Sequence, residues 1–342
     1  MSSVLRPVHP IGSAELLEHV REAYSVGGVE LTMDLGGSRN HSLLVTTGSG
    51  MLVIRVYRAG IPLDRLAAIQ WVRRTLSGRG VPTSVAYRAR SGELWSRYEG
   101  QIIEVEDYVE HSSQLDTWGR LEVALPILGR VHNILRTLSP SPASKKPVSV
   151  NYPTAAEVQE WTPRAMKRIE SWPLLPDQIE LVRSAEFLSR RLQELDGPLR
   201  GILPVQLVHG NFWGSSVLFR SGKVVLVTDL DFMAERPRIE DLALSLYFAS
   251  STLAKEPSSD RTLRRLRGLV DAYDGQLEDH LTPIERRALP LAIARAPLAV
   301  MQYVAQSERT EEAQHLLRAM RPDLTWAAAI VANMGHWQQG FS

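Results

Sequence analysis

The sequence predicts an α+β fold with two lobes, the first rich in β-strands and the second mainly helical. Three observations support this prediction. Residues 30–109 alternate short β-type runs with one helical stretch, apolar residues recur at helical spacing from Ser112 onward, and one further β-hairpin interrupts the helical part. We therefore expect an N-terminal lobe of residues 1–109 and a C-terminal lobe of residues 110–342.

The elements of the first lobe follow from periodicity and turn residues. The chain reads as helix, hairpin, helix, hairpin, with helices over 14–26 and 64–76 and strand pairs over 41–45 with 51–57 and 93–98 with 101–108. The sequence TTGSG marks the first hairpin turn. Glu99 and Gly100 form the turn of the second hairpin.

The second lobe is predicted to be helical over most of its length. Helices are expected over 121–138, 155–170 and 177–195, with a Pro/Ser/Lys loop over 139–152, and after Pro237 to the end, with breaks near 257–260, 281–283 and 321–323. The exception is residues 205–232, where a β-type run is followed by a tight hairpin around Ser221 and Gly222.

Composition limits the possible functions. The chain has 342 residues, of which 44% are hydrophobic, and its 39 Lys and Arg balance 38 Asp and Glu to leave a net charge of +1. This balance gives no indication of nucleic-acid binding. The absence of cysteine excludes disulfides, thiolate zinc sites and cysteine nucleophiles, and it fits a cytoplasmic protein.

No segment is expected to enter a membrane. The N-terminal sequence MSSVLRPVHPIGS lacks the apolar region of a signal peptide. Weakly charged apolar stretches such as 242–254 are shorter than the roughly 20 residues that a membrane-spanning helix needs. We therefore expect a soluble protein.

A candidate site is expected where the loop 209–215 enters the hairpin 216–232. Asp229 and Asp231 follow the second strand of this hairpin, and they would point to one face if the strand continued. Carboxylates that face amide and hydroxyl groups suit Mg²⁺. The alternative is that the two aspartates only cap a turn. Motifs for other chemistries (GxSxG, HExxH and GxxxxGK[ST]) are absent from the sequence.

Three spaced elements carry a resemblance to a known family. The segments HGNFWGSSVLF, VVLVTDLDF and RPRIEDLALSLYF, in this order, resemble the aminoglycoside phosphotransferase family of kinase-like enzymes. The preceding segments GGSRNHSLLVTTGSGMLVIRV, IIEVEDYVE and LGRVHNIL resemble the nucleotide-covering hairpin, the hinge strand and the first C-lobe helix of that family. The resemblance covers about residues 30–250. It implies a bilobal protein-kinase-like fold.

The resemblance also implies binding of ATP by the N-terminal lobe. Gly36, Gly37 and Ser38 would let the backbone approach the phosphates, and Arg55 matches the cation that holds them. Glu106, Asp107 and Tyr108 match the hinge, where backbone groups would bond adenine. In the family a glutamate on the next helix pairs with the cation, but residues 65–77 contain no acid.

In the C-terminal lobe the resemblance implies a catalytic loop and a metal site. Asp229 matches the Mg²⁺-binding aspartate, Asp231 is a possible helper near the substrate, and His209 would orient the loop by hydrogen bonds. Asp241 matches the aspartate that braces the loop from below, whereas His132 reads as a packed helix histidine.

Two positions depart from the family pattern. Asn211 occupies the place of the catalytic aspartate, and Ser216 that of the second metal ligand. An amide accepts a hydrogen bond but cannot take the proton of a substrate hydroxyl at neutral pH. A general base contributes about 10²–10⁴-fold. Because phosphoryl transfer depends mainly on positioning and charge neutralisation, a slower enzyme remains possible.

Three functions are compatible with these residues. The first is an ATP- and Mg²⁺-dependent phosphotransferase that acts on a hydroxyl of a small natural product or aminoglycoside-like antibiotic. The second is a pseudokinase that binds nucleotide or a small ligand without efficient turnover, and the third is a kinase-fold enzyme used for chemistry other than phosphoryl transfer. Trp213 in the loop is the best aromatic candidate for substrate contact. The acids Glu278, Asp279 and Glu285 could hold a cationic aminosugar, although a solvated helix face is the simpler interpretation.

Overall fold

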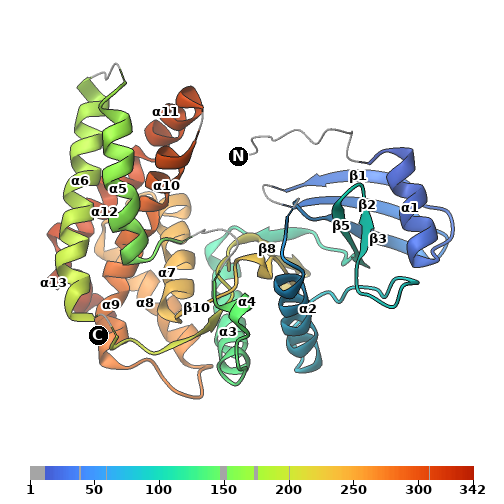
Figure 1. Cartoon of the computed structure of the whole chain (residues 1–342). Helices are drawn as coiled ribbons and strands as arrows, with labels where there is room; N and C mark the ends of the chain where they lie inside the picture. Colours follow the sequence, from blue (N-terminus) through green and yellow to red (C-terminus); the bar gives the residue numbers. More distant parts are fainter. Residues whose placement is uncertain are drawn as a thin grey trace. The chain divides into compact units, whose positions relative to one another are not determined.

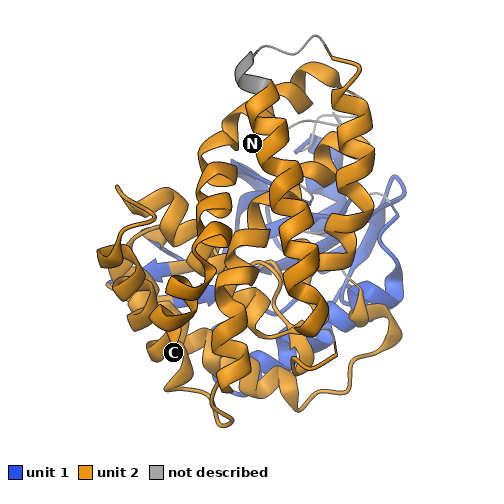
Figure 2. Cartoon of the chain, turned by 90° about the vertical axis from the view of Figure 1, so that its left-hand side faces the viewer, with its two compact units in different colours: residues 1–112, 219–221, 225–228 blue, residues 113–218, 222–224, 229–342 orange. Residues whose placement is uncertain are grey.

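The structure, a computed structural model, describes residues 12–37, 40–58, 60–146, 152–172, 176–199, 201–307 and 309–342. The chain forms two compact units (Figure 2). Unit 1 comprises residues 1–112 together with 219–221 and 225–228, and unit 2 comprises the remainder. The main division therefore falls three residues after the predicted one, and part of the C-terminal hairpin belongs to unit 1. The predicted α+β class is confirmed.

Unit 1 is built on a five-stranded antiparallel sheet (Figure 1). The strand order is β1-β2-β3-β5-β4, with β1 Glu30–Gly36, β2 His41–Thr47, β3 Gly50–Val56, β4 Ser96–Tyr98 and β5 Gln101–Asp107. Glu99 and Gly100 both have positive φ, 46° and 80°, as a type I′ hairpin turn requires. The predicted second hairpin is confirmed, with a shorter first strand.

The two faces of this sheet differ in character. Helix α1, Ala14–Tyr24, packs its apolar side on one face, where alternate residues of β2, β3 and β5 form the core. Helix α2, Leu63–Gly78, meets the other face, where its Leu66 packs with Ile102. Because side chains alternate along a strand, that second face also carries Arg55, Glu104 and Glu106.

Strand β1 was not predicted. It lies at the edge of the sheet, and six of its seven residues are exposed. A strand with little burial on either face shows no clear alternation of apolar and polar residues, so periodicity could not reveal it.

Unit 2 is mainly helical. Its helices are α3 Trp118–Arg136, α4 Pro142–Lys145, α5 Ala155–Ile169, α6 Pro176–Asp196, α7 Ile239–Phe248, α8 Asp260–Asp274, α9 Pro283–Arg295, α10 Ala299–Gln306, α11 Thr310–Ala319, α12 Arg321–Ala332 and α13 Met334–Phe341. Helices α5 and α6 pack with α10 and α12, and α7 packs with α9 (Figure 1). Capping boxes at Thr154 with Glu157 and at Thr282 with Glu285 determine where α5 and α9 begin.

Two small sheets lie among these helices. Strand β7 Val205–Val208 pairs with β10 Ala234–Pro237, and β8 Gly214–Arg220 lies between β6 Ser113–Leu115 and β9 Lys223–Val227. The turn between β8 and β9 has positive φ at Ser221 (50°) and Gly222 (75°), so the predicted hairpin is confirmed. Strands β6 and β10 were not predicted because three or four residues are too few to show a period.

One stretch of the described chain is long and apolar enough to cross a membrane by length and composition alone, namely Pro283–Gln306. The sequence analysis overlooked it because Glu285 and three arginines divide it into shorter apolar runs. Most of this stretch is buried among the other helices of unit 2, as in the core helix of a soluble protein.

Candidate active site

The loop between β7 and β8 approaches a second segment of unit 2 very closely at Gly210. This residue has a φ of 82°, and a Cβ added to it would lie 2.2 Å from the carbonyl oxygen of Phe232. Phe232 ends the 3₁₀ turn η2, Leu230–Phe232, which directly follows Asp229. Only glycine fits here, so the HG pair brings the loop beside the segment that carries the two aspartates.

Asp241, in the first turn of α7, holds the backbone of this loop. Its buried carboxylate accepts hydrogen bonds from His209 N at 2.6 Å and Gly210 N at 2.7 Å. The bracing role that the resemblance implied for Asp241 agrees with these contacts.

His132 also contacts Asp241, which the sequence analysis did not anticipate. His132 Nε2 lies 3.0 Å from Asp241 Oδ2, and its Nδ1 lies 2.6 Å from the hydroxyl oxygen of Tyr273. Since an ionised carboxylate only accepts, Nε2 carries a proton and donates to Asp241, while Nδ1 is hydrogen-bonded to the tyrosine hydroxyl. His132 is therefore packed, as predicted, and it also connects α3 and α8 to the loop.

The ionisation of Asp241 follows from these partners. Burial alone would raise the pKa of its carboxyl, but the hydrogen bond and charge of His132, together with His209 and the Gly210 N–H, outweigh burial and lower the pKa below its ordinary value. Asp241 is therefore a carboxylate at neutral pH and a strong acceptor for the loop.

Further contacts fix the loop from within. Asn211 N donates to His209 Nδ1 at 3.2 Å, and the buried His209 ring packs edge-on against Phe212 with centroids 5.7 Å apart. The hydroxyl of Ser245 donates to the Phe212 carbonyl at 2.7 Å. His209 thus contributes to the loop's conformation, in line with the orienting role expected for it.

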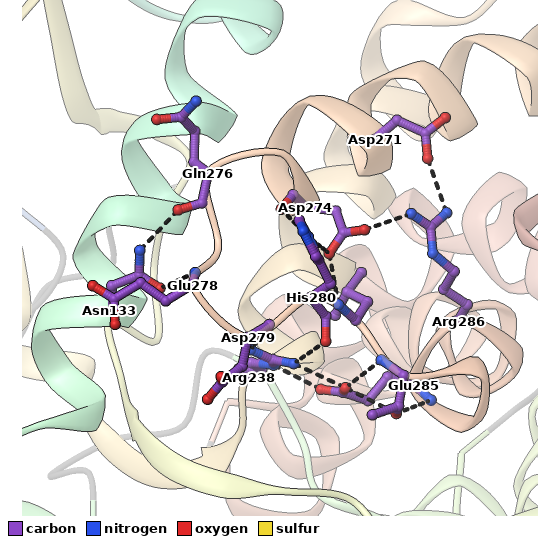
Figure 3. A network of polar contacts seen from close by, with 12 residues as sticks. Asn133, Arg238, Asp271, Asp274, Gln276, Glu278, Asp279, His280, Glu285 and Arg286 are labelled. Carbon is purple, nitrogen blue, oxygen red and sulfur yellow. Dashed lines mark hydrogen bonds and ion pairs between the residues drawn. The ribbon is translucent and has the colours of Figure 1, made fainter.

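The start of α7 is anchored by Arg238 (Figure 3). Its guanidinium forms a bidentate pair with Glu285, at 2.7 and 2.9 Å, and donates to the carbonyls of Asp279 and His280. A planar guanidinium matches a carboxylate in this way and orders both partners. The anchor determines where α7 begins and therefore where Asp241 lies.

The acids considered for an aminosugar are already paired with arginines. Glu285 is buried against Arg238, and Glu278 and Asp279 both pair with Arg136. Of the three, only Glu285 lies in a helix; the other two lie in the loop before α9, where Glu278 N donates to Asn133 Oδ1 (Figure 3). The prediction that these acids form a solvated helix face is therefore wrong.

Asn211, Ser216 and Asp229 form a chain of hydrogen bonds. Asn211 Nδ2 donates to Ser216 Oγ at 2.8 Å, and Ser216 Oγ donates to Asp229 Oδ2 at 3.1 Å. The direction is determined by chemistry, since a carboxylate only accepts and the buried serine has one proton to give. Asn211 must then present its amide nitrogen to Ser216, so the amide oxygen of Asn211 points away from Ser216.

Asp229 has an unusual backbone conformation. Strand β9 ends at Val227, and Asp229 lies in the left-handed region with φ 63° and ψ 40°. The strand therefore does not continue to Asp231, and the argument that both carboxylates share a strand face is wrong. Non-glycine residues in this region are uncommon, although aspartate tolerates it better than most, and such residues cluster at functional sites.

The oxygen atoms of Asp229 and Ser216 fit a magnesium ion whose other ligands are substrate phosphates and water. Asp229 supplies a half-buried carboxylate, and Ser216 supplies a hydroxyl hydrogen-bonded to it. Within the described residues no group of three or more His, Asp and Glu could form a metal cage. Mg²⁺ commonly uses one or two carboxylates together with substrate phosphates and water, so this sparse set is sufficient.

Trp213 provides an aromatic surface next to this chain of hydrogen bonds. It is half-buried and stacks on Phe248 at the end of α7, with centroids 5.1 Å apart and planes 10° apart. A π-helical turn, Ala249–Leu253, follows Phe248 directly. Single π-helical turns occur often at functional sites, so the Trp213–Phe248 pair is a candidate contact for substrate.

In unit 1 the glycines predicted to cover phosphates have the required conformational freedom. Gly36 and Gly37 have φ of 71° and 135°, and a Cβ on Gly37 would lie 1.9 Å from the carbonyl oxygen of Asn40. Ser38 lies outside the described residues. Asp231 in unit 2 is half-buried in η2.

Arg55 is buried on the second face of the sheet. Its Nη2 lies 3.5 Å from Glu106 Oε1 and donates to Thr228 Oγ1 at 3.1 Å, and Thr228 precedes Asp229 in the chain. The acid that the sequence analysis sought on the following helix is therefore on β5. Neither contact of Arg55 could be predicted from the sequence, because they join residues 51 and 173 positions apart in the chain.

The predicted hinge residues are engaged within the sheet. Glu106 pairs with Val53, and Tyr108 N donates to Met51 O at 3.3 Å. In an antiparallel ladder, hydrogen-bonded pairs recur every second residue, so both backbone polar groups of Glu106 point to β3. The same rule applies to Tyr108, whereas the backbone groups of Asp107 between them point away from β3. Hinge contacts to a nucleotide would then come from Asp107 or from residues after Tyr108, and this assignment stays a prediction.

Comparison with known proteins places this geometry in context. Residues 30–274 match the model of a family described as the phosphotransferase enzyme family. A homoserine kinase of Nitrobacter winogradskyi is 24% identical over 289 residues, which cover 84% of this chain and 82% of the relative.

Solved structures share the fold at lower identity. A microcompartment-associated aminopropanol kinase superposes with a TM-score of 0.70 at 15% identity, covering 94% of this chain and 99% of that one. An amicoumacin kinase, solved in complex with AMP-PNP, Ca²⁺ and Ami, gives a TM-score of 0.64 at 14% identity, covering 91% of this chain and 92% of that one.

Proposed function

The chain belongs to the phosphotransferase enzyme family, whose members act on small molecules, and from this premise we propose that it transfers the γ-phosphoryl group of ATP to a hydroxyl group of a small molecule that carries an amine. The observation that carries the proposal is the hydrogen-bonded chain from Asn211 through Ser216 to Asp229. It connects the position expected to orient the acceptor with the carboxylate expected to hold the metal.

Asp229 would hold Mg²⁺, with Ser216 at its side. When bound, the ion would neutralise the negative charge of the phosphates, which otherwise repels an approaching nucleophile. Ser216 fixes the carboxylate by donating to Oδ2. The left-handed backbone of Asp229, followed by the buried Leu230, limits the directions in which the carboxylate can turn.

Asn211 would orient the acceptor hydroxyl. The contact with Ser216 turns its amide oxygen to the opposite side, where it can accept a hydrogen bond from that hydroxyl. The amide cannot remove the proton, so the hydroxyl would have to lose it late, as its bond to phosphorus forms. A loose phosphoryl-transfer transition state permits this, at a lower rate than with a carboxylate base.

The acceptor class is supported by the relatives and by Trp213. Homoserine and aminopropanol, named for two of the relatives, each combine a hydroxyl with an amine. The Trp213–Phe248 pair offers an aromatic face on which a cationic amine can bind through cation–π attraction. Natural products and aminoglycoside-like antibiotics carry the same two groups and remain within the proposal.

A second candidate function, a pseudokinase, is favoured by one observation. The Ser216 hydroxyl, which stands at the second metal position, is used within the protein by Asn211 and Asp229. A protein with this arrangement could bind nucleotide through the remaining groups and turn it over only very slowly.

Two measurements separate these functions. Calorimetric titration with Mg²⁺·ATP tests for nucleotide binding, which both candidates require and which a repurposed enzyme does not. Acceptor-dependent release of ADP, measured with homoserine, aminopropanol and an aminoglycoside panel, then tests turnover. Binding with ADP release that depends on the acceptor supports the phosphotransferase, binding without release supports the pseudokinase, and the absence of binding contradicts both.

A further inference from the structure

Helix α2 carries an arginine at mid-helix, whereas the family resemblance predicts a glutamate on this helix as the partner of Arg55. Residues 65–77 contain no Asp or Glu, and Arg73, one of two buried arginines on this helix, pairs with acids of the sheet. The two acids of the cluster lie on β5 instead, at Glu104 and Glu106. Compared with the family pattern, the acid is thus on the strand and the helix carries a positive charge.

Arg73 binds both glutamates. Its Nη1 contacts Glu104 Oε1 and its Nη2 contacts Glu106 Oε2, while its Nε donates to the carbonyl of Ser84 at 3.0 Å. The Ser84 hydroxyl also donates to Glu106 Oε2, at 2.8 Å. A buried carboxylate that receives two such donors on one oxygen is firmly positioned.

The other oxygen of Glu106 faces Arg55. Arg55 Nη2 lies 3.5 Å from Glu106 Oε1, and both side chains are nearly inaccessible to solvent, at 10% and 5% exposure. Glu104, two residues earlier on the same strand, contacts Arg73 and Gln70 and forms no ion pair with Arg55. The two glutamates therefore share the contact with Arg73 and each has one neutral donor, Gln70 for Glu104 and Ser84 for Glu106, but only Glu106 pairs with Arg55.

We infer that Glu106 is the positioning residue of Arg55, and that Arg73 locks Glu106 in place from α2. The sheet, rather than an acid on the helix, would then hold the arginine ready for the phosphates of the nucleotide. The identity of the ligand rests on the proposed function; the positioning itself does not.

The test compares Glu106→Gln with the matched control Glu104→Gln. Each variant removes one buried negative charge that contacts Arg73, so both should lose stability to a similar extent. Only Glu106→Gln should raise the Kd for Mg²⁺·ATP, by about tenfold, as expected for loss of a charge-assisted contact that orders the binding arginine. Glu104→Gln should keep the wild-type Kd within about twofold. Equal changes in Kd for the two variants would overturn the inference.

A second measurement does not depend on nucleotide binding. In protein labelled with ¹⁵N-arginine, the guanidinium resonance of Arg55 is assigned by its loss in Arg55→Lys. We expect it to shift and broaden in Glu106→Gln and to stay close to its wild-type position in Glu104→Gln. If the wild-type protein binds no nucleotide, the proposed function fails while this spectrum still decides the inference. An Arg55 resonance unaffected by Glu106→Gln would contradict it.

Discussion

Asn211 donates from its amide nitrogen to Ser216 Oγ at 2.8 Å, so its amide oxygen is directed away from Ser216. The two positions at which the chain departs from its family are thus hydrogen-bonded to each other. They act as a pair, and substitutions at either should be interpreted with the other in view.

Asn211→Asp should raise kcat. A carboxylate can accept the proton of the acceptor hydroxyl, and a general base is worth about 10²–10⁴-fold. Because the variant also loses the amide donor to Ser216, we expect the lower end, about 100-fold. Steady-state ADP release measures the effect. Asn211→Ala serves as the control and should lower kcat, and an unchanged or lower rate in Asn211→Asp would count against the role given to this residue.

Asp229→Ala should abolish phosphoryl transfer, with a loss of more than about 10³-fold in kcat, because the part of the chain that the structure describes contains no cluster of acids and histidines that could hold the metal instead. Asp231→Ala provides the contrast. If Asp231 lies on the substrate side, its loss should raise KM for the acceptor and leave kcat within about tenfold of wild type. Equal loss of kcat in both variants would argue that the two acids have one shared role.

Trp213→Ala should raise KM for an amine-bearing acceptor by about tenfold and leave the Kd for Mg²⁺·ATP unchanged. The expected loss corresponds to a cation–π contact of about 1–2 kcal/mol. Trp213→Phe retains an aromatic face and should restore most of the affinity. If both variants bind the acceptor as the wild type does, the aromatic pair is structural only.

Asp241→Ala should destabilise unit 2 by about 3 kcal/mol. The substitution leaves two buried backbone N–H groups and His132 without their common acceptor, and each unsatisfied buried group costs about 1–3 kcal/mol. Urea denaturation followed by tryptophan fluorescence measures the change. Tyr273→Phe, which removes only the more distant hydroxyl of the same chain, should cost less.

Asp241 should also make stability dependent on pH. Its folded-state pKa is lowered, because the hydrogen bond from His132 and its neighbours outweigh the effect of burial, whereas the unfolded carboxyl titrates near 3.8. As pH falls, the unfolded chain therefore binds this proton first, and the stabilisation present above the unfolded pKa is progressively lost. Between about pH 5 and 3, wild type should lose stability more steeply than Asp241→Asn. Parallel pH profiles would contradict this.

Local chemistry explains which parts of the structure could be predicted from the sequence. Glu99-Gly100 and Ser221-Gly222 determine hairpin turns through their own backbone preferences, so both hairpins were predictable. The contact of His132 with Asp241 joins residues 109 positions apart, and no local pattern records it. Likewise, buried arginines are rare, so Arg73 was not expected beside the sheet, and the acid for Arg55 was sought on the wrong element.

The central claim is tested most directly by looking for the phosphorylated acceptor itself. Wild-type protein and the Asp229→Ala variant would each be incubated with Mg²⁺, ATP labelled with ³²P at the γ-position, and one acceptor: homoserine, aminopropanol or an aminoglycoside. Labelled products would then be separated and identified by mass spectrometry. We predict label in an acceptor with wild type and none with Asp229→Ala. If the label stays in ATP with every acceptor although ATP binds, the proposed phosphoryl transfer is wrong and the pseudokinase is supported. Label that appears only as inorganic phosphate would show hydrolysis of ATP and would contradict both functions.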